Sequence, residues 1–148
     1  MKQVCFVDAD KYVLAENYYD IADFAPENDI HCSYGSFLET GEYIIKEGFL
    51  FSANFPAINT FNTRRAACCH DFFFSLMKDG HLDRRHFDAV NYLFYDQLRE
   101  DGMMAHRAWY WYRAVQTFGK GVLDTPRPPK QYSPKKPEYA KQVKFGMA

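Results

Sequence analysis

Long hydrophobic runs are missing from this 148-residue sequence, and so is any large excess of charge of one sign. The longest run of apolar and aromatic side chains, Trp109 to Tyr112, is far shorter than the roughly 20 residues of a bilayer-spanning helix. We therefore expect no membrane span. The first residues, Met1 to Val4, open neither a long apolar stretch nor a small-residue cleavage site, so we also expect no secretory leader.

Cysteine is scarce, and no two of the four cysteines have C-x-x-C spacing. Reduced thiols are therefore expected, at Cys5, Cys32, Cys68 and Cys69. The run Cys68-Cys69-His70 raises zinc as one interpretation, but neighbouring side chains on a helix diverge and no second cysteine pair completes four ligands. The favoured interpretation is that both cysteines are small core residues, with no cofactor bound.

Aromatic residues are abundant, with 14 Phe and 11 Tyr, which predicts a core built largely from rings. Trp109 and Trp111 lie in a stretch with aromatic side chains on all sides of one expected helix. One side would join the core, and the other would contact a protein partner. A stacking platform for nucleic acid is disfavoured, because Lys and Arg are sparse beside these rings.

The first half of the chain has the short apolar runs of strands. Val4–Val7 and Tyr12–Leu14 are expected to form one hairpin, and Tyr43–Ile45 and Phe49–Phe51 a second. The acidic stretch 15–36 is expected to be loop.

From residue 62 the apolar period becomes helical. One helix is expected from Arg64 to Met77, before Asp79-Gly80, and a second from Asp83 as its cap to Asp101-Gly102. A third runs from about Met104 to Phe118 and ends at Gly119. His81, His86 and His106 lie at the expected helix ends and are interpreted as solvated or capping residues.

These patterns predict an α+β fold in which a small N-terminal β region packs on a three-helix antiparallel core, followed by an extended arm. Residues 1–123 would be a single globular domain, with the β and loop region in 1–61 and the helical core in 62–119. Residues 124–148 would be a basic, proline- and lysine-rich arm.

The expected arm differs in charge from the rest of the chain. Residues 125–148 have a net charge of +5, which leaves −6 for the preceding residues. We expect the arm to be held by a neighbouring copy or another protein. A flexible tail is the simpler alternative, and nucleic-acid binding is disfavoured. Its candidate contact residues are Arg127, Lys130, Tyr132, Lys135, Lys136, Tyr139 and Phe145.

Three stretches of the helical region are similar to a known family. They read R-R-A-A-C-C-H-D-F-F-F from Arg64, V-N-Y-L-F from Val90, and R-A-W followed by Y-R-A-V-Q-T-F-G between Arg107 and Gly119. In this order they resemble domain-of-unknown-function family 1353, found in tailed phages and prophages. The resemblance covers residues 44–119 and implies a phage origin without assigning an activity.

The polar positions of the family pattern have changed in this chain. Asn91 stands where the family has Asp, Gln116 where it has Arg, and Phe74 where it has Tyr. The run Phe51-Ser52-Ala53-Asn54 likewise replaces a Thr-Asp and Ser pattern. The hydrophobic frame of the motifs persists while the polar groups have changed.

His70-Asp71 is the pair with the most chemical potential. His70 falls on the inward face of the first helix and Asn91 on that of the second, so antiparallel packing would let them meet. The arrangement resembles secretory phospholipase A-two, which implies His70 as base for a water, Asp71 as calcium ligand and Asn91 as the group that orients the imidazole. However, an amide cannot stabilise an imidazolium by charge, and residues 48–62 contain no glycine-rich calcium loop. A structural His–Asn hydrogen bond is the favoured interpretation.

The preferred function is therefore a non-enzymatic structural or assembly component of a tailed-phage virion, in the tail or neck, made in the host cytoplasm. Its partners would be other phage structural proteins or copies of itself, bound through the arm. The first alternative is a calcium-assisted hydrolase acting on the host envelope. The second is a small host-takeover protein that binds a host protein.

Overall fold

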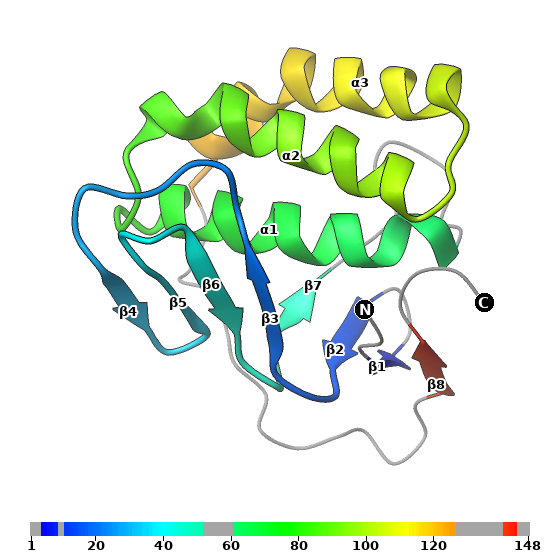
Figure 1. The fold of residues 1–148 in the computed structure, drawn as a ribbon, viewed down its shortest axis with the longest axis horizontal. Helices are drawn as coiled ribbons and strands as arrows, with labels where there is room; N and C mark the ends of the chain where they lie inside the picture. The colour runs from blue at the N-terminus through cyan, green and yellow to red at the C-terminus, as the bar shows by residue number, and fades with distance from the viewer. Residues whose placement is uncertain (1–3, 9–10, 52–60, 127–140, 145–148) are drawn as a thin grey trace.

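The computed structural model describes residues 4–8, 11–51, 61–126 and 141–144. Figure 1 shows the helices forming a layer above two sheets, with α1 next to the sheets and α3 farthest from them. The predicted α+β class is confirmed. No helix in the described ranges is long and apolar enough to cross a bilayer.

Within the described ranges each sheet has four strands, and every hydrogen-bonded pair of strands is antiparallel. One sheet has the order β7-β2-β1-β8 and the other the order β3-β6-β5-β4. The strand bounds are β1 Val4–Asp8, β2 Lys11–Leu14, β3 Tyr18–Ile21, β4 Ile30–Cys32, β5 Gly35–Phe37, β6 Glu42–Ile45, β7 Leu50–Phe51 and β8 Lys141–Lys144.

The prediction of a loop over residues 15–36 is wrong, because β3, β4 and the start of β5 lie there. Polar residues interrupt each of these short strands, which hides the alternation of buried and exposed side chains. Tyr18, Ile30 and Phe37 nonetheless point into the core. Register brings Tyr18 opposite Ile45 and Phe37 opposite both Ile30 and Tyr43, so these side chains share one apolar face.

The first predicted hairpin is confirmed, since β1 pairs with β2. The second is wrong: β6 and β7 do not pair with each other but join different sheets. Gly48, with φ of 90°, lies between them, and its N–H donates to the carbonyl of Leu14 at 2.7 Å. The turn therefore carries the chain from one sheet to the other.

The three expected helices are present as α1 Arg64–Lys78, α2 Phe87–Glu100 and α3 Ala105–Asp124, with short 3₁₀ segments η1 Phe61–Thr63 and η2 Arg84–His86. Asp83 was predicted to cap the second helix, but it caps η2, which precedes α2, by accepting from the N–H of Arg85 at 2.8 Å. The predicted end of the third helix at Gly119 is wrong, because α3 continues to Asp124. A Cβ on Gly119 would lie 2.9 Å from both Phe74 and Phe87, so close packing explains this glycine.

The core is aromatic, as predicted. Between the sheets and α1, Tyr43, Phe72 and Phe73 are fully buried and pack edge to face or stacked. A second cluster between the helices contains Phe94 and Trp111, whose ring centroids are 6.1 Å apart. Ala66 of α1 also belongs to this second cluster, so α1 contributes side chains to both clusters.

Arg65 links the sheet to the helices. Its buried guanidinium donates to Asp101 at 3.0 Å, to Glu100 at 2.7 Å and to the hydroxyl of Tyr18 at 3.0 Å. It also forms an ion pair with Asp20 at 3.4 Å. One α1 side chain thus joins β3 to the end of α2.

One part of the expected arm contacts its own domain instead of a neighbour. Residues 141–144 form β8, which pairs with β1 of the same chain in a register that sets Val4 opposite Lys144 and Val7 opposite Lys141. The arm therefore returns to its own domain at this point. All seven predicted contact residues of the arm lie outside the described residues.

Candidate functional site

His70 on α1 and Asn91 on α2 meet across the helix interface, as predicted. The Nε2 of His70 lies 2.7 Å from the Oδ1 of Asn91. Asn91 is completely buried, while His70 is half-buried. Both residues lie on inward faces because the apolar stripes of α1 and α2 pack on each other.

Two more residues extend this contact into a chain of hydrogen bonds. The Nδ2 of Asn91 donates to the Oε1 of Gln116 on α3 at 2.6 Å. The Nε2 of Gln116 lies 3.3 Å from the Oδ1 of Asp88, which is exposed on α2. The chain therefore runs from half-buried His70 through buried Asn91 to the surface at Asp88.

The carboxylate at the end fixes the direction of the whole chain. Asp88 can only accept, so Gln116 must present its amide N–H to Asp88 and its oxygen to Asn91. Asn91 must then present its N–H to Gln116 and its oxygen to His70. His70 therefore donates through Nε2, and its Nδ1 is the unprotonated nitrogen of the neutral ring.

The surroundings of His70 favour that neutral ring. Its centroid lies 4.1 Å from that of Phe74 and 4.8 Å from that of Phe94. Burial lowers the pKa of His70 to about 4, although the Asn91 hydrogen bond and nearby Asp71 act in the opposite direction. At neutral pH the imidazole is uncharged and is a weak base.

Asp71, the expected calcium ligand, is half-buried on α1 next to His70 in sequence. Across the part of the chain that the structure describes, no group of three or more His, Cys, Asp or Glu is arranged to hold a metal ion. Cys68 and Cys69 are buried core residues, as favoured from the sequence. The hydroxyl of Tyr43 donates to Cys69 at 3.4 Å, and burial raises the pKa of this thiol to about 11.

The two tryptophans proposed as partner contacts have different positions. Trp109 is 52% exposed, whereas Trp111 is only 2% exposed and packs in the helical core. The prediction that Trp111 contacts a partner is therefore wrong. Of the stretch 109–112, Trp109 and Tyr110 face outward, which agrees with the expected division between core and surface.

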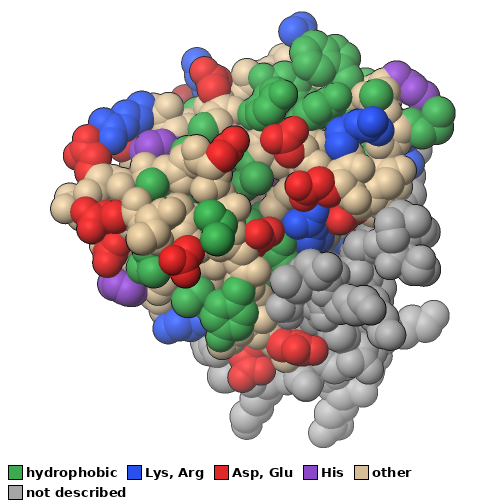
Figure 2. Space-filling model, in the orientation of Figure 1, with side chains coloured by type: hydrophobic (Ala, Val, Ile, Leu, Met, Phe, Trp, Pro, Cys, Tyr) green, Lys and Arg blue, Asp and Glu red, His purple; other side chains and the backbone are tan. Residues whose placement is uncertain are grey.

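Trp109 belongs to a surface cluster that we call the aromatic patch: Tyr92 and Tyr95 of α2 with Trp109 and Tyr112 of α3. The Trp109 and Tyr112 rings are 5.2 Å apart, and Tyr95 meets Trp109 edge to face at 6.3 Å. Tyr92 contacts Tyr112 edge to face at 6.1 Å. Figure 2 shows hydrophobic side chains gathered over α3, with Asp and Glu side chains below them over the α2 region.

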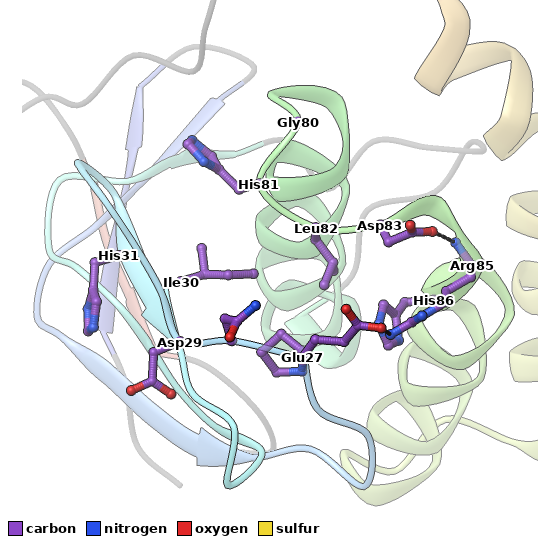
Figure 3. Close-up of a pocket in the computed structure, with 12 residues that line it drawn as sticks. Glu27, Asp29, Ile30, His31, Gly80, His81, Leu82, Asp83, Arg85 and His86 are labelled. Atoms are coloured by element: carbon purple, nitrogen blue, oxygen red, sulfur yellow. Dashed lines mark hydrogen bonds and ion pairs between the residues drawn. The ribbon is translucent and has the colours of Figure 1, made fainter.

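A separate polar pocket of about 430 Å³ lies between the segment leading into β4 and the connection from α1 to α2 (Figure 3). Glu27 and Arg85 form an ion pair at 2.7 Å on one side of it, and His31 and Asp29 lie on the other. Its lining includes neither His70 nor Asn91. It is lined by Pro26, Glu27, Asn28, Asp29, Ile30, His31, Gly80, His81, Leu82, Asp83, Arg85 and His86.

Sequence reasoning gave no site role to five residues of these sites. Gln116 and Asp88 complete the hydrogen-bond chain, and Tyr92, Tyr95 and Tyr112 complete the aromatic patch. The spacing of Asp88 and Asn91, three residues apart on one helix, could have indicated that both face the same neighbour. Gln116 was noted with Asn91 as a polar position that departs from the family pattern, but nothing local shows that they meet, which depends on how α3 packs on α2.

The comparisons with known proteins gave no match among family models, curated proteins or solved structures. The resemblance to family 1353 therefore stays a prediction from the three motifs.

Proposed function

We propose that this protein is a non-enzymatic structural or assembly component of a tailed-phage particle, and that it binds a protein neighbour through the aromatic patch. The phage setting rests on the motif resemblance alone. The contact role rests on a different observation: exposed, mutually packed rings on the α2–α3 face, with Trp109 52% and Tyr92 51% exposed.

The chemistry of the patch suits a protein interface. Trp and Tyr are enriched in such interfaces because rigid rings bury a large area at small entropic cost and keep a polar group at the edge. The ring contacts hold the side chains in place before binding, so little further ordering is needed.

The geometry of His70 supports a structural role for that residue. Its Nε2 proton is donated to Asn91, an amide that has no charge with which to stabilise an imidazolium. A base with a pKa near 4 is also poorly matched to proton abstraction at neutral pH. The hydrolase alternative is favoured by one observation only, the His70–Asn91 contact between two helices.

Purified particles and lipid hydrolysis assays separate the candidate functions. Mass spectrometry should find the chain in particles, and the full-length protein should release no fatty acid from phospholipid vesicles with calcium. Calcium-dependent release that His70→Ala abolishes would establish the hydrolase instead. Absence from particles, with recovery on a host protein, would establish the host-takeover alternative.

A further inference from the structure

The aromatic patch is bordered by acidic side chains on its α2 side. Asp96 follows Tyr95 directly, and its pKa is raised by partial burial and by the carboxylates of Asp23 and Glu100. Glu100 is paired with Arg65, so Asp23 and Asp96 are the carboxylates that add negative charge there. Asp88 adds a further carboxylate one helical turn before Tyr92.

Cationic groups beside the patch are few and partly occupied. Arg99 uses its Nη1 to donate to the carbonyl of Met103 at 2.7 Å. Arg113 of α3 is exposed and follows Tyr112. The patch thus combines packed rings with a flank where carboxylates predominate.

This combination fits an extended, proline-rich, basic segment. Proline rings stack on the faces of Tyr and Trp, and the carbonyls of a polyproline II chain accept from Tyr hydroxyls and the Trp indole N–H. Such a chain is already extended, so binding costs little conformational entropy. Lys and Arg on the same segment would pair with the acidic flank.

The chain itself contains a segment of this chemistry. Residues 126–137 include five of the seven prolines, with Arg127, Lys130, Lys135 and Lys136 and no acidic residue. As polyproline II, these residues would span about 37 Å at about 3.1 Å each, enough to cross two packed helices. Their net charge of +4 complements the acidic flank.

We propose that the aromatic patch of one copy binds residues 126–137 of a second copy. This inference rests on the proposed contact function and names the partner. A second copy is favoured over the same chain because described elements of this chain adjoin the segment on both sides, α3 ending at Asp124 and β8 beginning at Lys141. The end of α3 also lies about 18 Å along the helix from Tyr112, at about 1.5 Å per residue.

Two measurements on the full-length protein test this. In analytical ultracentrifugation the protein should self-associate in a concentration-dependent way. A labelled peptide of residues 125–138 should bind and, in excess, return the protein to monomer. Trp109→Ala and, separately, Tyr92→Ala should weaken peptide binding about tenfold or more, as expected for aromatic contacts at the centre of an interface.

Matched controls distinguish binding at the aromatic patch from nonspecific binding to exposed aromatic side chains. Tyr19 on β3 is 56% exposed, so Tyr19→Ala should change peptide affinity less than about twofold if the patch is the site. A peptide with every proline replaced by alanine keeps the charge and should bind about tenfold more weakly. Raising salt from about 50 to about 300 mM should weaken binding severalfold.

The inference is overturned if Trp109→Ala binds the peptide like the wild type, if the alanine peptide binds equally well, or if the protein stays monomeric at all concentrations. Circular dichroism of each variant shows whether it has folded, and Tyr92→Ala provides the second reading if Trp109→Ala has not. If Trp109→Ala is lost from particles while the peptide does not bind, this inference fails and the proposed function stands.

Discussion

Asn91 accepts the Nε2 proton of His70 across 2.7 Å between α1 and α2, and it does so as a neutral amide. The direction of this hydrogen bond is set at the other end of the chain, where the carboxylate of Asp88 accepts from Gln116 and so orients the Gln116 and Asn91 amides. The chain links all three helices, because Asp88 and Asn91 lie on α2, His70 on α1 and Gln116 on α3. It therefore stabilises the packing of the bundle, while burial keeps His70 uncharged.

Asn91→Asp should destabilise the protein at neutral pH by about 1–3 kcal/mol. The new carboxylate would face the Oε1 of Gln116, and rotating that amide would turn the same oxygen toward Asp88. Adding Gln116→Arg supplies donors to both carboxylates and should recover most of the loss. Urea unfolding of the two single variants and the double variant measures the coupling. Additive losses would contradict the directed chain.

Stability should fall as the pH is lowered from about 6.5 to about 4, and His70 should account for part of this. The folded pKa of His70 lies below the unfolded value, at about 4, so the unfolded state takes up the proton first. Its share is up to about 3 kcal/mol, present above the unfolded pKa and lost toward the folded pKa. Urea unfolding near pH 7 and near pH 4 should show a smaller loss for His70→Gln than for wild type. The exposed-residue control His106→Gln should behave like wild type.

Arg65→Ala should cost about 3–5 kcal/mol, because it leaves largely buried Asp101 and Tyr18 without their shared donor. Arg84 is a matched control: it pairs with Asp124 on the surface, with side chains 51% and 67% exposed. Arg84→Ala should cost no more than about 1 kcal/mol. Thermal and urea unfolding provide both values, and equal losses would refute the role assigned to the Arg65 cluster.

Two glycines of α3 should respond to alanine in opposite directions. Gly119→Ala places a Cβ against the rings of Phe74 and Phe87, so overpacking of about 1–3 kcal/mol outweighs the better helix propensity. Gly121 has open space at the same position, so Gly121→Ala should stabilise by up to about 1 kcal/mol. Unfolding midpoints that shift in the same direction for both variants would contradict the close packing described at Gly119.

The helical half of the fold could be predicted from sequence because its apolar residues recur every three or four positions over more than ten residues. That periodicity also placed His70 and Asn91 on facing stripes, and their contact is confirmed. In this half, the rule that a glycine ends a helix failed at Gly119, because α3 continues to Asp124. A glycine that permits close approach of Phe74 and Phe87 has the same local signature as one that ends a helix.

The β half was harder to predict because its strands have only two to five residues and several of them pair with strands that are distant in sequence. Nothing local shows that Tyr18 and Ile45 lie opposite each other, or that residues 141–144 return to β1. Trp111 was misjudged for a related reason. Which aromatic residues of α3 are buried depends on how α2 crosses it, and this is a property of the tertiary structure.

The most direct test of the proposed contact role is whether patch variants are incorporated into phage particles. With Trp109→Ala or Tyr19→Ala in place of the wild-type chain, quantitative mass spectrometry of purified particles gives the copies per particle. The account predicts that Trp109→Ala, though folded and expressed, is depleted about tenfold or more while Tyr19→Ala is incorporated normally. Normal incorporation of folded Trp109→Ala would contradict a contact role for the α2–α3 face.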